Sequence, residues 1–186
     1  MALNLPNTLT WIRIVAIPLI VVVFFLPVGW AGPAAGILFA LAGITDLLDG
    51  YLARKMGLTS RFGAFLDPVA DKLIVATALV LILQRDPAID LTIVASIIIG
   101  REITVSALRE WMSEIGASGK VAVSWFGKWK TTVQIIGISL LLYRLPIGPV
   151  NVFLVGKVLL YVAAALTILS MLDYLRSAWP SLRENS

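Results

Sequence analysis

The sequence of 186 residues contains neither cysteine nor histidine. Without cysteine, the chain has no disulfide, no thiolate metal site and no thiol nucleophile. Without histidine, it has no Ser-His-Asp triad, no histidine-ligated zinc and no histidine-ligated haem. Any acid–base catalysis must therefore use carboxylates, lysine or tyrosine.

Charge is also scarce. Charged residues make up 14% of the chain and hydrophobic residues 59%, with a mean hydropathy of +0.94. A soluble domain is typically about 25% charged and roughly 45–50% apolar. The composition therefore excludes an ordinary soluble domain, and its hydrophobicity excludes a disordered chain.

Long apolar runs are abundant. Six stretches approach or exceed the roughly 20 apolar residues that a helix needs to cross a bilayer. They cover residues 9–26, 32–52, 62–83, 91–111, 121–142 and 150–175. The first lacks a small-residue cleavage site and is followed closely by further spans, so we do not interpret it as a signal peptide. We expect an all-α integral membrane bundle of six transmembrane helices, forming one domain over residues 1–186.

Basic residues gather at one end of these predicted helices. They are Arg54, Lys55, Arg61, Arg109, Lys120, Lys128, Lys130, Arg176 and Arg183. The opposite connections contain Arg85 and Arg144. Because cytoplasmic loops carry an excess of lysine and arginine, both termini are predicted to be cytoplasmic.

Four aspartates lie near the connection between the second and third predicted helices. Asp46 and Asp49 are spaced i, i+3, and Asp67 and Asp71 are spaced i, i+4. Each pair therefore shares one helix face. Since the connection is short, we expect the two helices to be antiparallel neighbours whose four carboxylates converge on one point.

Such a cluster requires a positive charge. An uncompensated aspartate within a spanning helix costs roughly 2.5–3.5 kcal/mol, and four together repel one another. Oxygen-only ligands suit hard ions such as Mg²⁺, Mn²⁺ or Ca²⁺, and four carboxylates could hold two ions about 3.5–4 Å apart. The alternative is an interfacial salt-bridge network with the neighbouring Arg54, Lys55, Arg61 and Lys72. Gly50 and Gly63, beside the two pairs, favour close approach of a ligand or a second backbone.

The pattern Asp46-x-x-Asp49-Gly50-x-x-Ala53-Arg54, eight residues, then Gly63-x-x-x-Asp67-x-x-x-Asp71 resembles the signature of the CDP-alcohol phosphatidyltransferase family. The resemblance implies transfer of a phosphatidyl group from a CDP-linked lipid to an alcohol, with release of CMP. It also implies two divalent cations, Mg²⁺ or Mn²⁺, held by these four aspartates. By the same resemblance, Asp71 is also the general base and the protein is a homodimer.

The N-terminal run Pro6-Asn7-x-x-Thr10-x-x-Arg13 is similar to a further feature of that family. The resemblance implies that Asn7, Thr10 and Arg13 bind the CDP-lipid together with Gly50, Ala53, Arg54 and Gly63. The alternative is that Asn7 or Thr8 caps the first helix and Arg13 lies at the membrane interface.

A second polar group lies on the fourth and fifth predicted helices. Glu102, Ser106, Arg109 and Ser113 form a stripe at helical spacing, Arg101 adds a cation, and Lys128, Lys130, Thr131 and Gln134 follow on the next helix. Arginine and lysine recognise phosphate, so the cluster favours an anionic acceptor. Simple pairing of Glu102 with Arg101 or Arg109 is the alternative for part of it.

These segments are similar to bacterial family members whose acceptor is sn-glycerol 3-phosphate. That resemblance implies phosphatidylglycerophosphate and CMP as products, with Arg101, Arg109, Lys128, Lys130 and Thr131 binding the acceptor phosphate. We therefore expect CDP-diacylglycerol, glycerol 3-phosphate and the lipid bilayer as partners, with no nucleic acid. The expected location is the bacterial cytoplasmic (inner) membrane, with the active site facing the cytoplasm.

The sequence leaves two other functions open. A related enzyme could use another acceptor, such as inositol phosphate or serine. A divalent-cation transporter would need polar residues that continue to the other face of the membrane, whereas the acids here crowd one end of the predicted helices.

Overall fold

The structure is a computed structural model of the chain. It describes the backbone of residues 5–56, 61–114 and 125–184, and the side chains of residues 10–46, 66–114, 129–176 and 179. The described part is all-helical, as the apolar runs predict, and forms six helices. They are α1 (Leu5–Phe24), α2 (Ala31–Met56), α3 (Arg61–Arg85), α4 (Ile89–Glu114), α5 (Trp125–Tyr143) and α6 (Val152–Glu184).

Each helix contains most of one predicted apolar stretch and ends near the proline, glycine or charged residues that bound it. α1 stops at Phe24, shortly before Pro27, and α5 stops at Tyr143. Arg144 follows α5 with a φ of 63°. This left-handed conformation cannot continue an α-helix, so it terminates α5.

Within the described residues, two segments are long and apolar enough to cross a membrane by length and composition, Ile89–Glu114 and Val152–Arg176. Two shorter apolar segments, Thr10–Phe24 and Ala31–Asp46, belong to α1 and α2. Apolar side chains also cover much of the outer surface, from Val15 and Val22 on α1 to Ile103 on α4 and Leu169 on α6. A surface of this kind is typical of a membrane protein.

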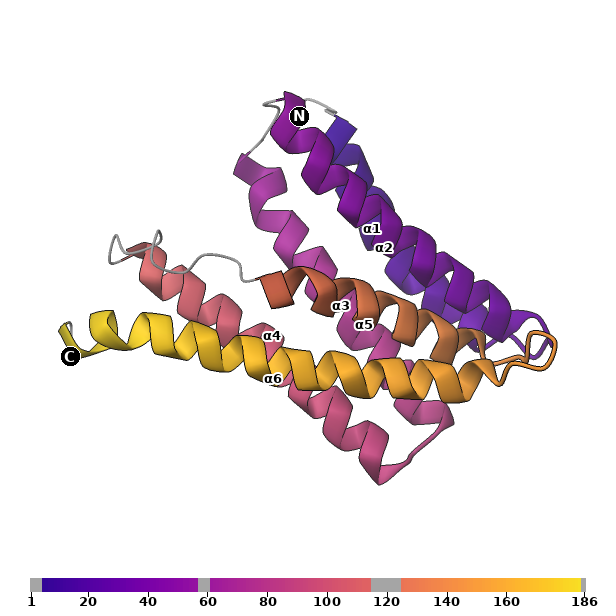
Figure 1. The fold of residues 1–186 in the computed structure, drawn as a ribbon. Helices are drawn as coiled ribbons and strands as arrows, with labels where there is room; N and C mark the ends of the chain where they lie inside the picture. Colours follow the sequence, from indigo (N-terminus) through magenta and orange to yellow (C-terminus); the bar gives the residue numbers. More distant parts are fainter. Residues whose placement is uncertain (1–4, 57–60, 115–124, 185–186) are drawn as a thin grey trace.

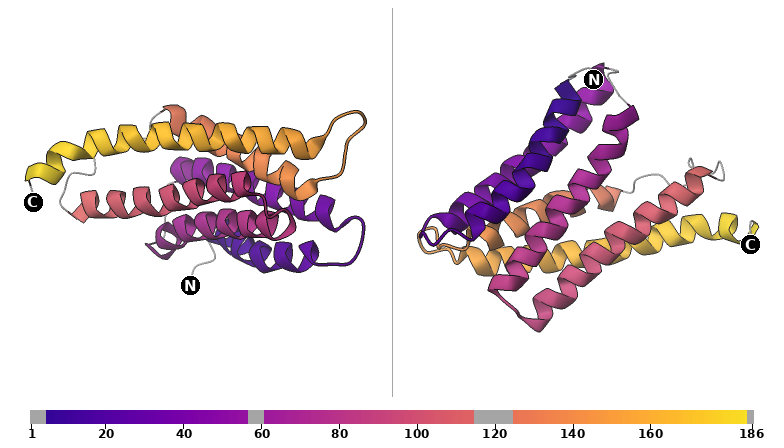
Figure 2. Two further views of the ribbon diagram at one scale, coloured as in Figure 1. Left: turned by 90° about the horizontal axis from the view of Figure 1, so that it is seen from below. Right: turned by 180° about the vertical axis from the view of Figure 1, so that it is seen from behind.

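The helices form two arms that are joined at one end and separate toward the other (Figure 1). α1, α2 and α3 make one arm, and α4 and α6 make the other, with α5 packed against both α2 and α6. The N-terminus and the C-terminus lie at the separated ends, as the views from below and behind also show (Figure 2).

α1 occupies a position that the sequence did not predict. We expected α2 and α3 to be direct neighbours, but the described parts of these helices contact each other sparsely, whereas α1 packs against both. Side chains of α1 are therefore available to bridge the aspartates of α2 and α3.

The buried core lies where the arms join. It includes Phe39 of α2, Leu79 of α3, Ile98 of α4, Ile138 of α5 and Leu160 of α6, each no more than 2% exposed. Close approach of α2 and α5 depends on Gly36, because a Cβ there would lie 2.6 Å from the Ser139 carbonyl oxygen. Apolar packing thus fills the joined end, and space remains between the arms toward the termini.

Candidate active site

A cavity of about 370 Å³ lies between the arms, on the side of the core that faces the termini. Its volume is within the range of small-molecule sites, roughly 300–1,000 Å³. Five helices contribute its polar lining: Arg13, Asp46, Asp67, Asp71, Lys72, Arg101, Glu102, Ser106, Arg109, Thr131 and Gln134. Three of the four acidic residues come from α2 and α3, whereas α4 contributes Arg101 and Arg109 beside Glu102, so the cavity has an acidic wall on α2 and α3 and a basic wall on α4.

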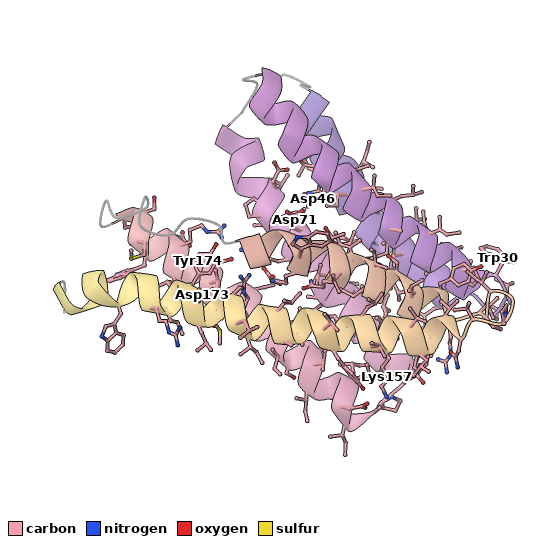
Figure 3. All side chains as sticks on the ribbon, viewed as in Figure 1. Trp30, Asp46, Asp71, Lys157, Asp173 and Tyr174 are labelled. Atoms are coloured by element: carbon pink, nitrogen blue, oxygen red, sulfur yellow. The ribbon has the colours of Figure 1, made fainter. Side chains whose placement is uncertain are left out.

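The acidic wall is organised by α1. The guanidinium of Arg13 lies between two carboxylates: its Nη2 is 3.1 Å from Asp46 Oδ1, and its Nη1 donates to Asp71 Oδ1. One turn earlier, the Thr10 hydroxyl donates to Asp67. Asp46 and Asp71 project from facing helices toward the space between the arms (Figure 3). The acids of α2 and α3 therefore line one cavity, but the three described carboxylates do not meet at one point as the spacing predicted.

The positively charged group between these aspartates is the guanidinium of Arg13. Arg13 is 1% exposed, while the Asp46 and Asp71 side chains are 32% and 40% exposed. A charge as deeply buried as that of Arg13 requires paired counter-charges. The sequence resemblance assigned Arg13 and Thr10 to the CDP-lipid, and the structure places both in direct contact with the aspartates.

The aspartates provide the chemistry that a hard cation requires. All three offer oxygen ligands and line one cavity, which suits Mg²⁺ or Mn²⁺. As they stand, no three acids among the described residues are close enough to hold one ion, since Arg13 takes Asp46 and Asp71 while Thr10 takes Asp67. The aspartates fit a metal ion when their contacts with Arg13 and Thr10 are replaced by contacts with the ion. The side chain of Asp49 lies outside the described residues.

Glu102 contacts two cations of the basic wall. It accepts a hydrogen bond from Lys130, which is 3% exposed, and its Oε1 is 3.4 Å from Arg101 Nη1. The predicted pairing of Glu102 with an arginine is therefore present, and Lys130 is a second partner. Arg101 and Arg109 both line the cavity, so its basic wall retains more positive charge than Glu102 neutralises.

Helix α6 supports both arginines from behind. Arg101 Nη2 donates to Ser170 Oγ at 2.8 Å, and Arg109 Nη2 donates to the Tyr174 hydroxyl at 3.4 Å. The guanidinium carbons lie 5.7 Å and 6.0 Å from the centroid of the Tyr174 ring, within cation–π range. Figure 3 shows Tyr174 on the arm formed by α4 and α6.

Sequence reasoning missed Ser170 and Tyr174. The available signal was their i, i+4 spacing, together with Asp173, at the end of a long apolar helix. Of the other predicted acceptor residues, Thr131 lines the cavity and Lys130 reaches it through Glu102. Several predicted site side chains fall outside the described residues: Asn7, Asp49, Gly50, Ala53, Arg54, Gly63 and Lys128.

The described residues give no support to a transmembrane ion path. Beyond the cavity, toward the joined end, the space between the helices is filled by the buried apolar side chains of the core, including Ala78, Ile98 and Ile138. A cation pathway would need polar groups there. The cavity is instead a site where an acidic group of residues faces a basic one.

Comparison with known proteins adds independent information. The profile of the CDP-alcohol phosphatidyltransferase family matches residues 3–169. A protein of Haemophilus influenzae is 50% identical over 187 residues, covering 100% of this chain and 98% of its own length. Proteins of Yersinia enterocolitica (50% over 184 residues, 99% of this chain and 100% of the relative) and Escherichia coli (49% over 178 residues, 96% of each) are similar. All three are named CDP-diacylglycerol–glycerol-3-phosphate 3-phosphatidyltransferase.

Proposed function

The chain belongs to the CDP-alcohol phosphatidyltransferase family, and we propose that it transfers the phosphatidyl group of CDP-diacylglycerol to sn-glycerol 3-phosphate. An oxygen–phosphorus bond forms between the acceptor hydroxyl and the lipid phosphate, and the bond to CMP breaks. The products are phosphatidylglycerophosphate and CMP. The full-length relatives named for this reaction support the proposal.

The observation that carries the acceptor assignment is the pairing of an acidic and a basic wall across one cavity. Glycerol 3-phosphate has a hydroxyl to be deprotonated and a phosphate to be bound. A phosphate held by the basic wall on α4 directs the hydroxyl toward the aspartates of α2 and α3. A neutral or cationic acceptor would leave the positive charge of this wall only partly neutralised, by Glu102.

Asp71 is the residue that we assign as general base. Its side chain lines the cavity and is 40% exposed, so an acceptor hydroxyl can reach it. With no histidine in the chain, a carboxylate is the available group for this proton transfer. Arg13, bonded to Asp71, orients the carboxylate.

For the acceptor phosphate we assign Arg101, Arg109 and Thr131, which line the cavity, together with Lys130 and, from the sequence alone, Lys128. Lys130 acts in part through Glu102, which it binds directly. Guanidinium groups supply bidentate, charge-assisted hydrogen bonds to phosphate oxygens. This assignment predicts that the acceptor's KM depends on the α4 arginines.

For the CDP-lipid we assign Thr10 and Arg13 of α1, with Asn7, Gly50, Ala53, Arg54 and Gly63 from the sequence signature. Thr10 and Arg13 lie against the aspartates, which is where a diphosphate neutralised by cations would be held. The guanidinium of Arg13 can bind the diphosphate in place of a carboxylate, because a guanidinium group forms bidentate hydrogen bonds with either anion.

Members of this family generally use a divalent metal. We assign Asp46, Asp49, Asp67 and Asp71 as the residues that would hold two ions, Mg²⁺ or Mn²⁺. When bound, the ions would neutralise the diphosphate oxygens and the departing CMP. The chain itself contributes the carboxylate ligands, the base and the cationic wall for the acceptor.

The same proposal places the enzyme in the bacterial cytoplasmic membrane. In this proposal all six helices cross the bilayer and form a single domain, and two copies of the chain form a homodimer. Both termini and the cavity lie on the cytoplasmic side. The two apolar spans and the bacterial relatives support the membrane assignment. The position of the cavity near the terminal ends of the helices supports a site reached by a soluble phosphorylated acceptor.

An acceptor screen tests the function. Purified protein in detergent is incubated with CDP-diacylglycerol, Mg²⁺ and one acceptor at a time: glycerol 3-phosphate, inositol phosphate, inositol or serine. Mass spectrometry of the lipid product should show phosphatidylglycerophosphate, with CMP released in equal amount. A preference for another acceptor would overturn the assignment of the basic wall to glycerol 3-phosphate.

A further inference from the structure

A deeply buried amide group lines the catalytic cavity. It belongs to Gln134 of α5, whose side chain is 4% exposed. Its carbonyl oxygen, Oε1, has no hydrogen-bond partner among the described residues. The other uncharged polar residues of the lining, Ser106 and Thr131, are only partly buried. A buried polar atom without a partner costs free energy, so the oxygen of Gln134 requires an explanation.

Gln134 lies between the acidic wall and the basic wall. On the acidic side, α2 approaches α5 closely, because a Cβ on Gly43 would lie 2.7 Å from the side chain of the residue that follows Gln134. Gly43 also lines the cavity, and it precedes Asp46 by three residues, about 4.5 Å along the helix. On the basic side, Lys130 is one turn before Gln134 and contacts Glu102 of α4. One helical turn along α2 or α5 therefore leads from the level of this amide to a charged residue on either side.

The chemistry of the amide indicates what kind of group complements it. An amide has a carbonyl that accepts hydrogen bonds and an NH₂ that donates them. Because the last torsion of a glutamine side chain is broad and roughly two-fold, either end of the amide can face the cavity. Apolar side chains of the same lining, including Phe39, Val105 and Ile135, offer no hydrogen bond. A neutral group that both donates and accepts, such as a hydroxyl of a molecule in the cavity, is the matching partner.

The proposed acceptor carries one group that the two walls do not bind. In the proposed function, the phosphate of glycerol 3-phosphate lies against the arginines of α4, and its terminal hydroxyl is deprotonated by Asp71. A further hydroxyl is attached to the second carbon, between these two ends. When the two ends of the acceptor lie on opposite walls, this middle hydroxyl is between the walls, as Gln134 is.

We propose that Gln134 binds the second-carbon hydroxyl of glycerol 3-phosphate and makes the enzyme selective for a glycerol phosphate. The inference rests on the proposed function and adds a specificity-determining residue to it. The hydroxyl donates to Oε1 of the amide, which gives the buried oxygen its partner. An acceptor without this hydroxyl leaves the amide unpaired, and a site built to bond a hydroxyl rejects analogues that lack it.

The test compares two acceptors that differ only in this hydroxyl. The monophosphate of propane-1,3-diol retains the phosphate and the terminal hydroxyl of glycerol 3-phosphate but has only hydrogen on its second carbon. With saturating CDP-diacylglycerol and Mg²⁺, kcat/KM is measured for each acceptor with the purified protein in detergent. The readout is the ratio of the two values, which we call the acceptor preference. Partial unfolding lowers both values equally and leaves this ratio unchanged.

Wild type should prefer glycerol 3-phosphate at least about tenfold, because the analogue leaves the buried amide unpaired. Gln134→Met and Gln134→Leu replace the amide with apolar groups of similar size. In both variants, kcat/KM for glycerol 3-phosphate should fall about 10- to 100-fold, while kcat/KM for the analogue should stay within about threefold of wild type. Activity with the analogue also shows that these variants are folded. Gln134→Glu retains an oxygen that accepts from the hydroxyl, so it should keep the preference.

Ser139→Ala is the matched control on the same helix. The Ser139 hydroxyl donates to the Ile135 carbonyl at 2.7 Å, and Ser139 does not line the cavity. This variant removes a polar group from α5 and should keep the wild-type acceptor preference. Ser106→Ala removes a partly buried hydroxyl from the cavity lining itself, and it should keep the preference as well.

Three results would overturn the role of Gln134 while leaving the proposed function intact. The first is a wild-type enzyme that uses both acceptors equally well, since no residue would then recognise the hydroxyl. The second is an equal loss with both acceptors in the two apolar variants, which would make Gln134 a structural residue. The third is loss of the preference in Ser106→Ala alone. Failure of the wild type to convert glycerol 3-phosphate would instead refute the proposed function itself.

Discussion

Arg13 is the residue on which the acidic wall depends. It reaches from α1 to Asp46 on α2 and Asp71 on α3, and it is almost completely buried. Without a positive charge between them, these carboxylates would repel each other. Arg13 therefore supplies the positive charge that a divalent cation would supply in the proposed metal site, and that proposal requires the carboxylates to exchange Arg13 for the metal.

Replacing Arg13 should make stability depend more strongly on metal. In EDTA, Arg13→Gln should lower the free energy of unfolding by about 1–2 kcal/mol and the melting temperature by about 2–8 °C. Added Mn²⁺ should raise the melting temperature of Arg13→Gln by more than it raises that of wild type, because metal then supplies the missing charge. Thermal unfolding of the detergent-purified protein, with and without Mn²⁺, measures both effects.

The control is Arg144→Gln, which removes an arginine bonded to Asp86 at the other end of the bundle, with Nη1 2.5 Å from Oδ2. It should alter the melting temperature equally with and without Mn²⁺. An identical Mn²⁺ shift in wild type and Arg13→Gln would show that Arg13 does not substitute for the metal.

The assignment of Asp71 as base makes a kinetic prediction. Asp71→Asn keeps the shape of the side chain but cannot accept the proton, so CMP release should fall at least about hundredfold. The variant should still elute as the native protein, since Asp46 remains as a partner of Arg13. Release of CMP from CDP-diacylglycerol and glycerol 3-phosphate is the measurement.

Asp90→Asn is the matched control for that experiment. Asp90 is bonded to Lys157 at 2.6 Å and to Tyr161, at the first turn of α4 and far from the cavity. This variant loses a comparable polar contact and should keep its turnover. If Asp71→Asn retained turnover within about threefold of wild type, another group would have to be the base.

At the scale of helices, α6 supports the site although none of its described side chains lines the cavity. Tyr174, which is 5% exposed, contacts both Arg101 and Arg109, and Ser170 holds Arg101. The arginines are long and would otherwise lose side-chain entropy on binding a phosphate. Packing against α6 fixes them in advance, so the helix contributes to affinity indirectly.

Tyr174→Ala should therefore affect the acceptor more than the lipid. Loss of the ring removes about 0.5–2 kcal/mol of cation–π contact, so the KM for glycerol 3-phosphate should rise about 2- to 30-fold. The KM for CDP-diacylglycerol should stay within about twofold. Tyr174→Phe retains the ring and loses the 3.4 Å bond to Arg109, and it should recover most of the affinity.

Tyr161→Ala provides the comparison on the same helix. Tyr161 contacts Asp90 at the opposite end of the bundle, so its loss should leave both Michaelis constants near wild type. Steady-state kinetics with each substrate varied in turn distinguishes the cases. Equal increases in both constants for Tyr174→Ala would assign α6 to general stability instead of acceptor binding.

The six helices could be predicted from the sequence because an apolar run of this length usually forms an α-helix in a bilayer, where every backbone polar group must be hydrogen-bonded within the segment. The aspartate spacing predicted four carboxylates at one place, and the three whose side chains the structure describes line one cavity. The position of α1 between α2 and α3 could not be predicted, because helices that are apolar on every side show no periodic face to identify their neighbours. Tyr174 was missed for a related reason. Its role depends on a contact with Arg109, which lies on another helix and 65 residues earlier in the sequence.

The molecule as a whole has two chemically different ends. The cavity and its charged walls lie toward the chain termini, and the apolar core fills the middle and the joined end. At the outer margin of the joined end, polar pairs return: Arg144 with Asp86, and Lys157 with Asp90. Figure 3 shows Trp30 and Lys157 at this end, opposite Asp46 and Asp71. An apolar band between two polar ends is the arrangement expected of a protein that spans a bilayer.

The proposed orientation can be tested directly because the natural chain has no cysteine, so each introduced cysteine is a unique label. Gly29→Cys lies between α1 and α2, where a Cβ meets no atom within 4 Å, and Ser113→Cys lies on the exposed surface near the end of α4. A membrane-impermeant maleimide should label Gly29→Cys on intact spheroplasts, but Ser113→Cys only after permeabilisation. Val15→Cys, exposed on the middle of α1, should resist labelling in both cases because maleimide reaction requires a thiolate in water. The reverse labelling of Gly29→Cys and Ser113→Cys would place the cavity on the outer side of the membrane, away from a cytoplasmic supply of glycerol 3-phosphate.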